Sequence, residues 1–332
     1  MRGLRARAAR VIVRWGLDTL GPVLAEVGSA RPFVVASERW SELELPFKPA
    51  GRWTEVPSDR IEEATAAAKG ADAVVAIGGG SAIDLGKAIS AATGLPVVSV
   101  PTTYAGAEWT PYFGIRDPDR RLHGGGSGAH LAAIVYDADL VGGLPLAVMV
   151  GTAMNALAHC AEALYVEGRN DDADAHALEG ARLIGEFVPR VVDAPEDREL
   201  RERLLGGACE AGQALGGSML ALGHAMAQAL GGRYGLPHGA LNAICLPAAL
   251  RFNEPVAPDA LRRLGTALRT DDPIARVEEL ARLGGFERLR DLGVPEEDLD
   301  DVAEAVAARP GAKANPRPAS PEQVAELLRS VW

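Results

Sequence analysis

The sequence predicts an N-terminal α/β domain over residues 1–150 and an all-helical domain over residues 151–332. In the first half, short and nearly continuous apolar runs alternate with helical stretches, which is the pattern of a parallel sheet covered on both faces. Beyond about residue 150 these runs stop, and Ala- and Leu-rich helical segments follow one another. A length of 332 residues suits two domains of roughly 100–200 residues each.

Four apolar runs in the first half predict buried strands. Helical periodicity separates them at residues 60–69 and 82–92, and Val11–Val13 is a further short strand candidate. After the first of the four runs there is too little room for a full helix before Gly51. The predicted strands are Phe33–Ser37, Ala73–Ile77, Val97–Val100 and Ala133–Tyr136.

The second half predicts a series of helices, the last of which has a clear start signal. Ser320 precedes Pro321 and stands three residues before Gln323, so we expect a capping box with proline in the first turn. The predicted helices are Gly151–Val166, Asp172–Phe187, Glu196–Gln213, Met219–Leu230, Ala240–Phe252, Pro258–Ala267, Pro273–Leu283, Pro295–Ala308 and Pro321–Val331.

Composition and charge limit the possible partners. The formal net charge is −11, which argues against nucleic acid because phosphate binding needs a clustered basic face. No apolar run approaches the roughly 18 residues of a membrane span, so no membrane is expected. The arginine-rich Met1–Arg14 lacks the apolar region of a signal peptide, and we expect a solvated end. Cys160, Cys209 and Cys245 are odd in number and widely spaced, which favours buried thiols and a cytoplasmic protein.

A glycine-rich turn, residues 78–81 with the sequence GGGS, directly follows the Ala73–Ile77 run and opens a helical stretch. Glycines allow close backbone approach to an anion, and a helix start offers free N–H groups and a favourable dipole. A glycine run is often only a tight turn, but its place between strand and helix favours phosphate binding. The spacing is not the G-x-G-x-x-G of a classical dinucleotide turn.

Several segments resemble one known superfamily. GGGSAIDLGKAI (78–89) and PTTYAGAEWTPYFGI (101–115) resemble the cofactor-binding half of the iron-type alcohol dehydrogenases. The second segment, together with MNALAHCAEALY (154–165) and the ending that contains Asn315 and Arg317, is closer to the maleylacetate reductase branch. The resemblance covers nearly the whole chain and implies the dehydroquinate synthase-like fold, with a dinucleotide-binding α/β domain followed by an all-α domain. It also implies a homodimer, because members commonly pair through their N-terminal strands.

The resemblance implies NADH or NADPH, with the pyrophosphate on the glycine turn. Ser37 ends a strand where a ribose-binding carboxylate often lies, and it is followed by Glu38, which leaves the choice between the two cofactors open. Taken alone, the threonines that follow the 97–100 run could equally cap the next turn. The residues expected along the cofactor are Gly78, Gly79, Gly80, Ser81, Asp84, Thr102, Thr103, Leu140 and Ser37.

Three of the six histidines lie in family-like helical segments, and they are the candidate catalytic residues. Asn155 and His159 are four residues apart and share a helix face, while His224 and His238 lie further along the chain. One histidine on an apolar helix is usually a satisfied core residue, but three in such contexts favour a common site. The other three histidines, His123, His130 and His176, are expected at the surface.

The same four positions hold a divalent ion in metal-using members of the superfamily, where they are one Asp and three His. Here the Asp position is Asn155, whose neutral amide is a poorer ligand than a carboxylate. His159, His224 and His238 could still form a zinc-type site, so zinc or iron is allowed by the sequence and not required.

The chain also departs from the family pattern. Gln228 stands where members carry a further histidine, and Asn242 lies near the place of another. Neither residue titrates near neutral pH, although both can hydrogen-bond a substrate. Arg317 or Arg233 could pair with a substrate carboxylate through two parallel hydrogen bonds, although an exposed or structural role is favoured for Arg233.

The leading hypothesis is an NAD(P)H-dependent reductase of a ketone or aldehyde, with a keto acid as the favoured substrate. His159, His224 and His238 would polarise the carbonyl oxygen or donate the proton, with Asn155 and Gln228 as orienting donors. One alternative is a metal-dependent dehydrogenase of a non-acidic alcohol. Another is an altered family member that uses the site for a non-redox step or as a binding scaffold in a biosynthetic pathway. The sequence does not name the substrate.

Overall fold

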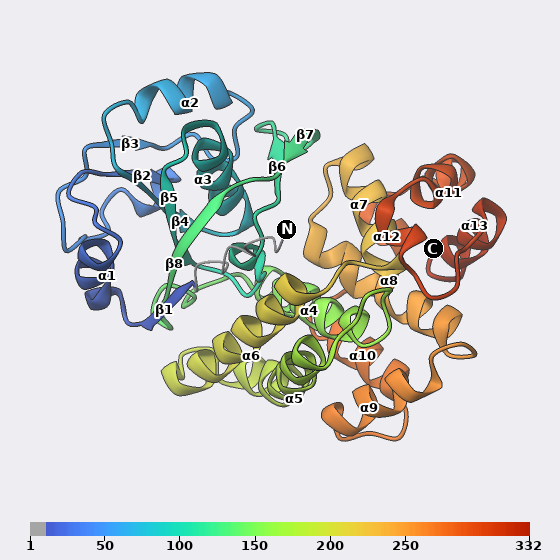
Figure 1. Cartoon of the computed structure of the whole chain (residues 1–332). Coiled ribbons are helices and arrows are strands. Elements are labelled where there is room, and N and C mark those ends of the chain that lie inside the picture. Colours follow the sequence, from blue (N-terminus) through green and yellow to red (C-terminus); the bar gives the residue numbers. More distant parts are fainter. Residues whose placement is uncertain (1–10) are drawn as a thin grey trace, which may run out of the picture. The chain divides into compact units, whose positions relative to one another are not determined.

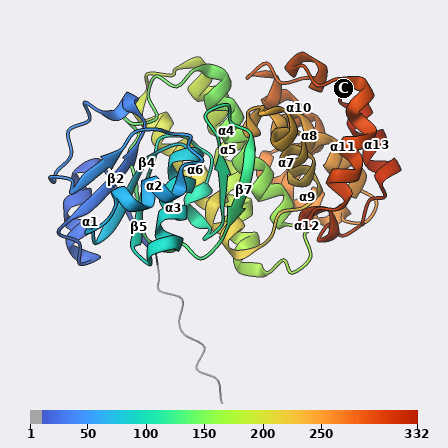
Figure 2. The same ribbon diagram turned by 90° about the horizontal axis from the view of Figure 1, so that it is seen from above.

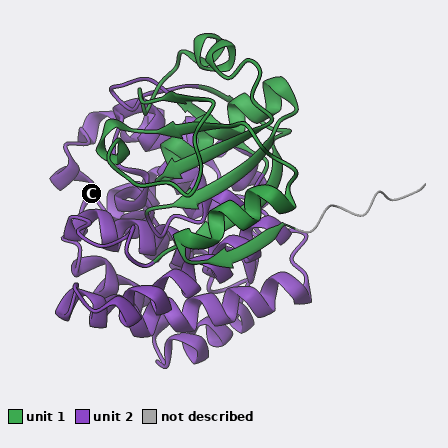
Figure 3. Ribbon diagram, turned by 90° about the vertical axis from the view of Figure 1, so that its left-hand side faces the viewer, with its two compact units in different colours: residues 1–102, 111–115, 124–137 green, residues 103–110, 116–123, 138–332 purple. Residues whose placement is uncertain are grey.

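The computed structural model describes residues 11–332 and divides this part of the chain into two compact units (Figure 3). The first unit contains residues up to 102 together with 111–115 and 124–137. The second contains 103–110, 116–123 and 138–332. Two short segments from the α/β half of the sequence therefore belong with the helices. Most of the arginine-rich end expected at Met1–Arg14 lies outside the described residues.

The first unit is built around a six-stranded sheet of order β1-β8-β5-β4-β2-β3, with every neighbouring pair parallel (Figure 1). Its central strands consist largely of buried Val, Ala and Ile, which confirms the parallel sheet predicted from the apolar runs. The Val11–Val13 candidate appears as the edge strand β1. The strands are β1 (Ile12–Trp15), β2 (Pro32–Ala36), β3 (Gly51–Trp53), β4 (Ala73–Gly78), β5 (Pro96–Pro101) and β8 (His130–Tyr136).

Helices α1 (Leu20–Glu26), α2 (Ile61–Ala67) and α3 (Gly80–Thr93) complete the first unit. Between β2 and β3 there is only a 3-10 turn, in agreement with the short crossover expected there. α3 packs so closely on β4 that a β-carbon at Gly86 would lie 2.7 Å from that of Ala76.

A second, two-stranded sheet was not predicted. It consists of β6 (Phe113–Arg116) and β7 (Leu122–Gly126). β7 is fully exposed and contains three glycines, so it lacks the apolar pattern by which strands are recognised in a sequence.

The second unit is helical, as predicted, and the capping box at Ser320 and Gln323 is present. α5 runs past the predicted end at Phe187 and through Pro189, because a proline removes only one helical hydrogen bond and the buried Val188 and Val191 favour continuation. The helices are α4 (Leu146–Ala163), α5 (Asp171–Asp193), α6 (Arg198–Gly217), α7 (Leu222–Tyr234), α8 (His238–Asn253), α9 (Pro258–Leu268), α10 (Pro273–Arg282), α11 (Leu299–Ala307), α12 (Pro310–Lys313) and α13 (Pro321–Ser330).

α4 is the central helix of this unit. It packs against α5, α6 and α8, and α7 lies beside α8 (Figure 2). Contrary to the expectation that no segment suits a membrane span, Leu146–Ala163 is long and apolar enough to cross a membrane. Because 78% of that window is buried inside the protein, α4 is the core helix of the second unit.

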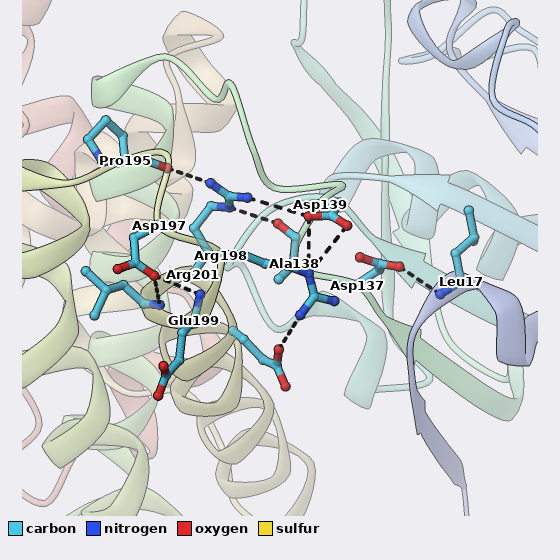
Figure 4. Close-up of polar contacts among 11 residues, drawn as sticks. Leu17, Asp137, Ala138, Asp139, Pro195, Asp197, Arg198, Glu199 and Arg201 are labelled. Carbon is cyan, nitrogen blue, oxygen red and sulfur yellow. Dashed lines mark hydrogen bonds and ion pairs between the residues drawn. The ribbon is translucent and has the colours of Figure 1, made fainter.

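The start of α6 is tied to the chain segment that follows β8 (Figure 4). The buried guanidinium of Arg201 donates to the carbonyl oxygens of Ala138 at 3.0 Å and Pro195 at 2.7 Å, and lies 3.6 Å from the Asp139 carboxylate. Asp197 caps α6 by accepting from two backbone N–H groups of its first turn. Arg201 is thus a buried cation whose partners are all supplied by the protein.

Candidate active site

Three helices of the second unit bring the predicted histidines together. His159 lies on α4, His224 near the start of α7, and His238 opens α8. The rings of His159 and His224 stack with centroids 4.7 Å apart, and those of His224 and His238 are 5.7 Å apart. We call these three residues the histidine cluster.

His224 has a carboxylate partner. Its Nδ1–H donates to Oε2 of Glu162 at 2.8 Å, and both side chains are at most 1% exposed. Glu162 also accepts from the backbone N–H groups of Ala221 and His224. With the ring proton on Nδ1, the lone pair of Nε2 is available, and this atom is buried without a hydrogen-bond partner among residues 11–332. The carboxylate compensates the charge of the ring when Nε2 takes up a proton.

The two asparagines hold His238. The amide nitrogen of Asn242 donates to Oδ1 of Asn155 at 2.7 Å and lies 3.0 Å from Nε2 of His238. An amide nitrogen can only donate, so Nε2 must accept and the ring proton of His238 is on Nδ1. That N–H is buried and has no partner within the described chain. His238 therefore presents a free donor, while His224 presents a free acceptor.

Segment 103–110 lies against the same helices. The amide of Asn155 donates to the carbonyl oxygen of Ala105 at 2.9 Å. Gly106 has a φ of +75°, and a β-carbon there would lie 3.5 Å from Nδ1 of His159. Both polar groups of Asn155 are thus used inside the protein, which makes it a positioning residue for this segment and, through Asn242, for His238.

Burial keeps two of the three rings neutral. Desolvation, together with His224 and His238, holds the pKa of His159 well below its usual value. Desolvation also lowers the pKa of His238 to about 3, with smaller contributions from His224, Arg116 and Arg309. His224 is the ring in the histidine cluster that has a buried carboxylate beside it.

The predicted polar residues outside the cluster have separate positions. Gln228 lies one turn after His224 on α7 and accepts, at 3.5 Å, from the guanidinium of Arg309. Arg317 stacks on the ring of Phe252 at 4.2 Å and donates to its carbonyl oxygen. Phe252 is at the far end of α8 from His238, about 20 Å along the helix axis. We therefore do not retain Arg317 as a substrate-binding residue.

The glycine turn of the first unit has the geometry of an anion site. Gly78 has a φ of +150°, and a β-carbon there would lie 2.7 Å from that of Ala82, so only glycine fits. Gly79 is the N-cap of α3, with no side chain capping it, and Gly80 and Ser81 form the first turn. The first N–H groups of the helix are therefore available to a phosphate.

Two other predicted cofactor residues follow the carboxyl ends of β2 and β5, the strands on either side of β4. Ser37 directly follows β2, and Thr102 follows β5 and donates its backbone N–H to Gly78. Asp84 pairs with the buried Lys87 at 2.8 Å and accepts from the N–H of Gly114, so its carboxylate also shapes the loop after β5. Thr103 and the buried Leu140 belong to the second unit.

The residues of the cluster do not fit a resident divalent metal. Within residues 11–332 there is no group of three or more His, Cys, Asp or Glu side chains that could hold one. The amide oxygen of Asn155, the fourth predicted ligand, already accepts a hydrogen bond from Asn242.

Sequence reasoning did not single out two residues that contact the predicted site residues, Glu162 and Arg309. Glu162 is a lone carboxylate in an apolar helix, three residues after His159, and this isolation was an available signal. Arg309 lies in an ordinary polar stretch before α12 and could not have been singled out.

A parallel sheet with a glycine turn at a helix N-terminus, together with a helical unit that carries a buried histidine–carboxylate pair, defines a dinucleotide-dependent oxidoreductase. The comparisons with known proteins are more specific. Residues 9–136 match the model of the iron-containing alcohol dehydrogenases, and residues 149–332 match the C-terminal model of the Fe-containing alcohol dehydrogenase family.

Among its relatives, the chain is 33% identical over 329 residues to a maleylacetate reductase of Pseudomonas sp. strain P51, covering 95% of this chain and 93% of that protein. Its fold is similar to the maleylacetate reductase of Agrobacterium tumefaciens, with a TM-score of 0.88, 32% identity and coverage of 100% and 99%. The enzyme from Rhizobium sp. strain MTP-10005 has the same score, identity and coverage. The chain belongs to the iron-containing alcohol dehydrogenase family, in its maleylacetate reductase branch, and is an NAD(P)-dependent oxidoreductase.

Proposed function

We propose that the chain reduces a keto acid at the histidine cluster with NADH or NADPH. Two neighbouring features of the histidine cluster carry this proposal. His224 is hydrogen-bonded to the carboxylate of Glu162, and His238 has an Nδ1–H group without a partner within residues 11–332. The relatives are named for maleylacetate, which is itself a keto acid. The reduction of a keto acid needs both a proton donor and a neutral hydrogen-bond donor at the carbonyl oxygen.

The residues divide the work as follows. During reduction, negative charge develops on the carbonyl oxygen, whether the carbonyl carbon or a conjugated carbon is reduced. The Nδ1–H of His238 donates a hydrogen bond to this oxygen, and Asn242 and Asn155 keep its ring in that orientation. Nε2 of His224 first takes up a proton from solvent and then donates it to the substrate, while Glu162 holds the ring through Nδ1–H and balances its charge.

The cofactor is held by the first unit in this proposal. Gly78, Gly79, Gly80 and Ser81 bind the pyrophosphate at the start of α3, and Ser37 and Thr102 lie at the same edge of the sheet. When bound, the reduced nicotinamide supplies the hydride. Thr103 and Leu140, which belong to the second unit, stay predicted cofactor residues.

Cofactor binding can be tested without turnover. NADH or NADPH at about 100 times its dissociation constant should stabilise the protein by roughly 2.7 kcal/mol, seen as a rise in melting temperature. Gly79→Val should abolish the rise, because a branched side chain would stand where the phosphate approaches. If neither cofactor at millimolar concentration shifts the wild-type melting temperature, the redox function is wrong.

We also propose that the reaction needs no metal. The support is the donor set, which consists of three imidazoles and an amide whose oxygen already accepts from Asn242. We expect substoichiometric zinc or iron after purification and unchanged activity in a chelator. Asn155→Asp should raise metal affinity by supplying a carboxylate. A full equivalent of metal kept through dialysis, with turnover lost on chelation, would contradict this.

The function itself is tested with a panel of keto acids, neutral ketones and aldehydes, by following NADH and NADPH oxidation. We expect turnover of a keto acid, and loss of kcat by about 10²- to 10⁴-fold in His224→Ala. No turnover with any carbonyl compound would reject the proposal.

The three cysteines are free and buried, which supports a cytoplasmic protein, and the edge strand β1 supports a homodimer.

A further inference from the structure

Arg309 is a cation without a counter-ion at the edge of the histidine cluster. It directly precedes α12, and its guanidinium turns towards α7. There it makes two long hydrogen bonds, both to Gln228: one to Oε1 at 3.5 Å and one to the backbone oxygen at 3.4 Å. Its Nε is buried and has no hydrogen-bond partner in the described part of the chain. Nor does any carboxylate of residues 11–332 form an ion pair with it.

Two other arginines of this unit have closer polar partners than Arg309 has. Arg201, which is more deeply buried, donates to two carbonyl oxygens at 2.7 and 3.0 Å and lies beside Asp139 (Figure 4). Arg233, on the same helix as Gln228, pairs with Asp298 at 3.0 Å. A half-buried guanidinium that lacks such partners is costly, and an anionic ligand would remove that cost.

The position of Arg309 points to the substrate. Gln228 follows His224 by one turn on the same face of α7, so the guanidinium lies next to the residue that shares a face with the proposed proton donor. Its Nη2 is also 3.9 Å from where a β-carbon of Gly232 would be, one turn further along α7. The positive charge of Arg309 also contributes to the lowered pKa of His238.

We propose that Arg309, held by Gln228, binds a carboxylate of the substrate through its guanidinium while the carbonyl oxygen lies at the histidine cluster. This inference rests on the proposed function and adds to it the residue that selects acids over neutral carbonyl compounds. A planar guanidinium binds a carboxylate through two parallel hydrogen bonds, a geometry that an ammonium group does not reproduce.

Gln228 determines the net charge of the carboxylate subsite, by which we mean Arg309 and Gln228 together. Its amide oxygen orients the guanidinium without neutralising it, so the positive charge remains available to the substrate. Gln228→Glu would place a carboxylate within ion-pair distance of Arg309 and fill the subsite from inside the protein. This variant adds an ion pair to the fold, so it tests the subsite without removing a structural contact.

The first test measures binding without turnover. Glutarate, a dicarboxylate that cannot be reduced, is titrated into wild type, Arg309→Gln, Gln228→Glu and Arg317→Gln by calorimetry and thermal shift, with neutral glutaramide as the comparison ligand. We expect glutarate to bind wild type and Arg317→Gln alike, and to bind both subsite variants on the order of 10- to 100-fold more weakly. Glutaramide should not distinguish the four proteins.

The second test uses the keto acid that wild type reduces. In Arg309→Gln its KM should rise about 10- to 100-fold with a smaller change in kcat, Arg309→Lys should recover part of this loss, and neutral ketones should be unaffected. Equal glutarate affinity in wild type and Arg309→Gln, or no glutarate binding by wild type, overturns the inference. If glutarate binding depends on Arg309 while no carbonyl compound is reduced, the inference stands and the proposed function falls.

Discussion

His224 differs from the other rings of the histidine cluster in having a buried carboxylate beside it. Glu162 is completely buried and accepts three hydrogen bonds, two of them from backbone N–H groups, so it cannot rotate away from the ring. His176 and Glu210 form a second hydrogen-bonded histidine–carboxylate pair, but their side chains are about 30% exposed to solvent. The Glu162–His224 pair is shielded from water, whereas the surface pair is not.

At this scale we predict that Glu162→Gln lowers kcat by at least about tenfold, because the imidazolium of His224 loses its counter-charge. The KM of the substrate and the melting-temperature shift with NADH or NADPH should change little. Glu210→Gln, which alters the matching surface pair, should leave kcat as it is. A kcat for Glu162→Gln equal to that of wild type would show that His224 does not transfer the proton.

Among the elements of the first unit, β2 and β4 are aligned by the loops that lead into them. Asp72 immediately precedes β4, and its carboxylate accepts from the hydroxyl of Ser29 and the backbone N–H groups of Ala30 and Arg31, just before β2. Although desolvation raises the pKa of Asp72, these hydrogen bonds outweigh it and the pKa is lowered. The carboxylate therefore helps to hold the strands that end at Ser37 and at the glycine turn.

Asp72→Asn should lower the free energy of unfolding by roughly 1–3 kcal/mol at pH 7. Because the folded-state pKa is below the unfolded one, the contribution is complete above about pH 4–5 and is lost as pH falls through the folded value. The difference in free energy of unfolding between wild type and Asp72→Asn, measured by urea unfolding, should thus be smaller at pH 3.5 than at pH 7. Ser29→Ala should lower the free energy of unfolding by less than Asp72→Asn does. A difference that does not change with pH would rule out this linkage.

For the whole molecule, β1 is the edge strand of the sheet, paired only with β8 among the described strands. It ends in Trp15, which is 41% exposed although it stacks on Tyr136 with centroids 5.0 Å apart. An exposed edge with a large aromatic side chain is a surface suited to pairing with a second copy.

We predict that light scattering gives twice the 34.7 kDa mass of the chain at micromolar concentration. Trp15→Lys should weaken this association by placing a charge at the sheet edge. Val148→Lys, at a surface hydrophobic residue of the second unit that is also 41% exposed, should not weaken it. The monomer mass at all concentrations would contradict the dimer.

The fold class was predictable from the sequence because its signals are local. The runs that form β2, β4, β5 and β8 are apolar over their own length, and the glycine turn lies between a strand and a helix that are adjacent in the chain. Similarly, Asn155 and His159 share a helix face through their spacing alone. The set of histidines was also recognisable, since each lies in a segment that resembles the family.

The chemistry of the site depended on contacts that only helix packing decides. Glu162 meets His224 across 62 residues, Asn155 meets Asn242 across 87, and Gln228 meets Arg309 across 81. Which side chains meet at such separations depends on how α4, α7 and α8 pack, and on how the segment before α12 lies against α7. No periodicity within one segment encodes these arrangements. For this reason the sequence predicted which residue types form the site, while the tertiary structure determined which ring has a carboxylate, which presents an N–H, and which arginine contacts Gln228.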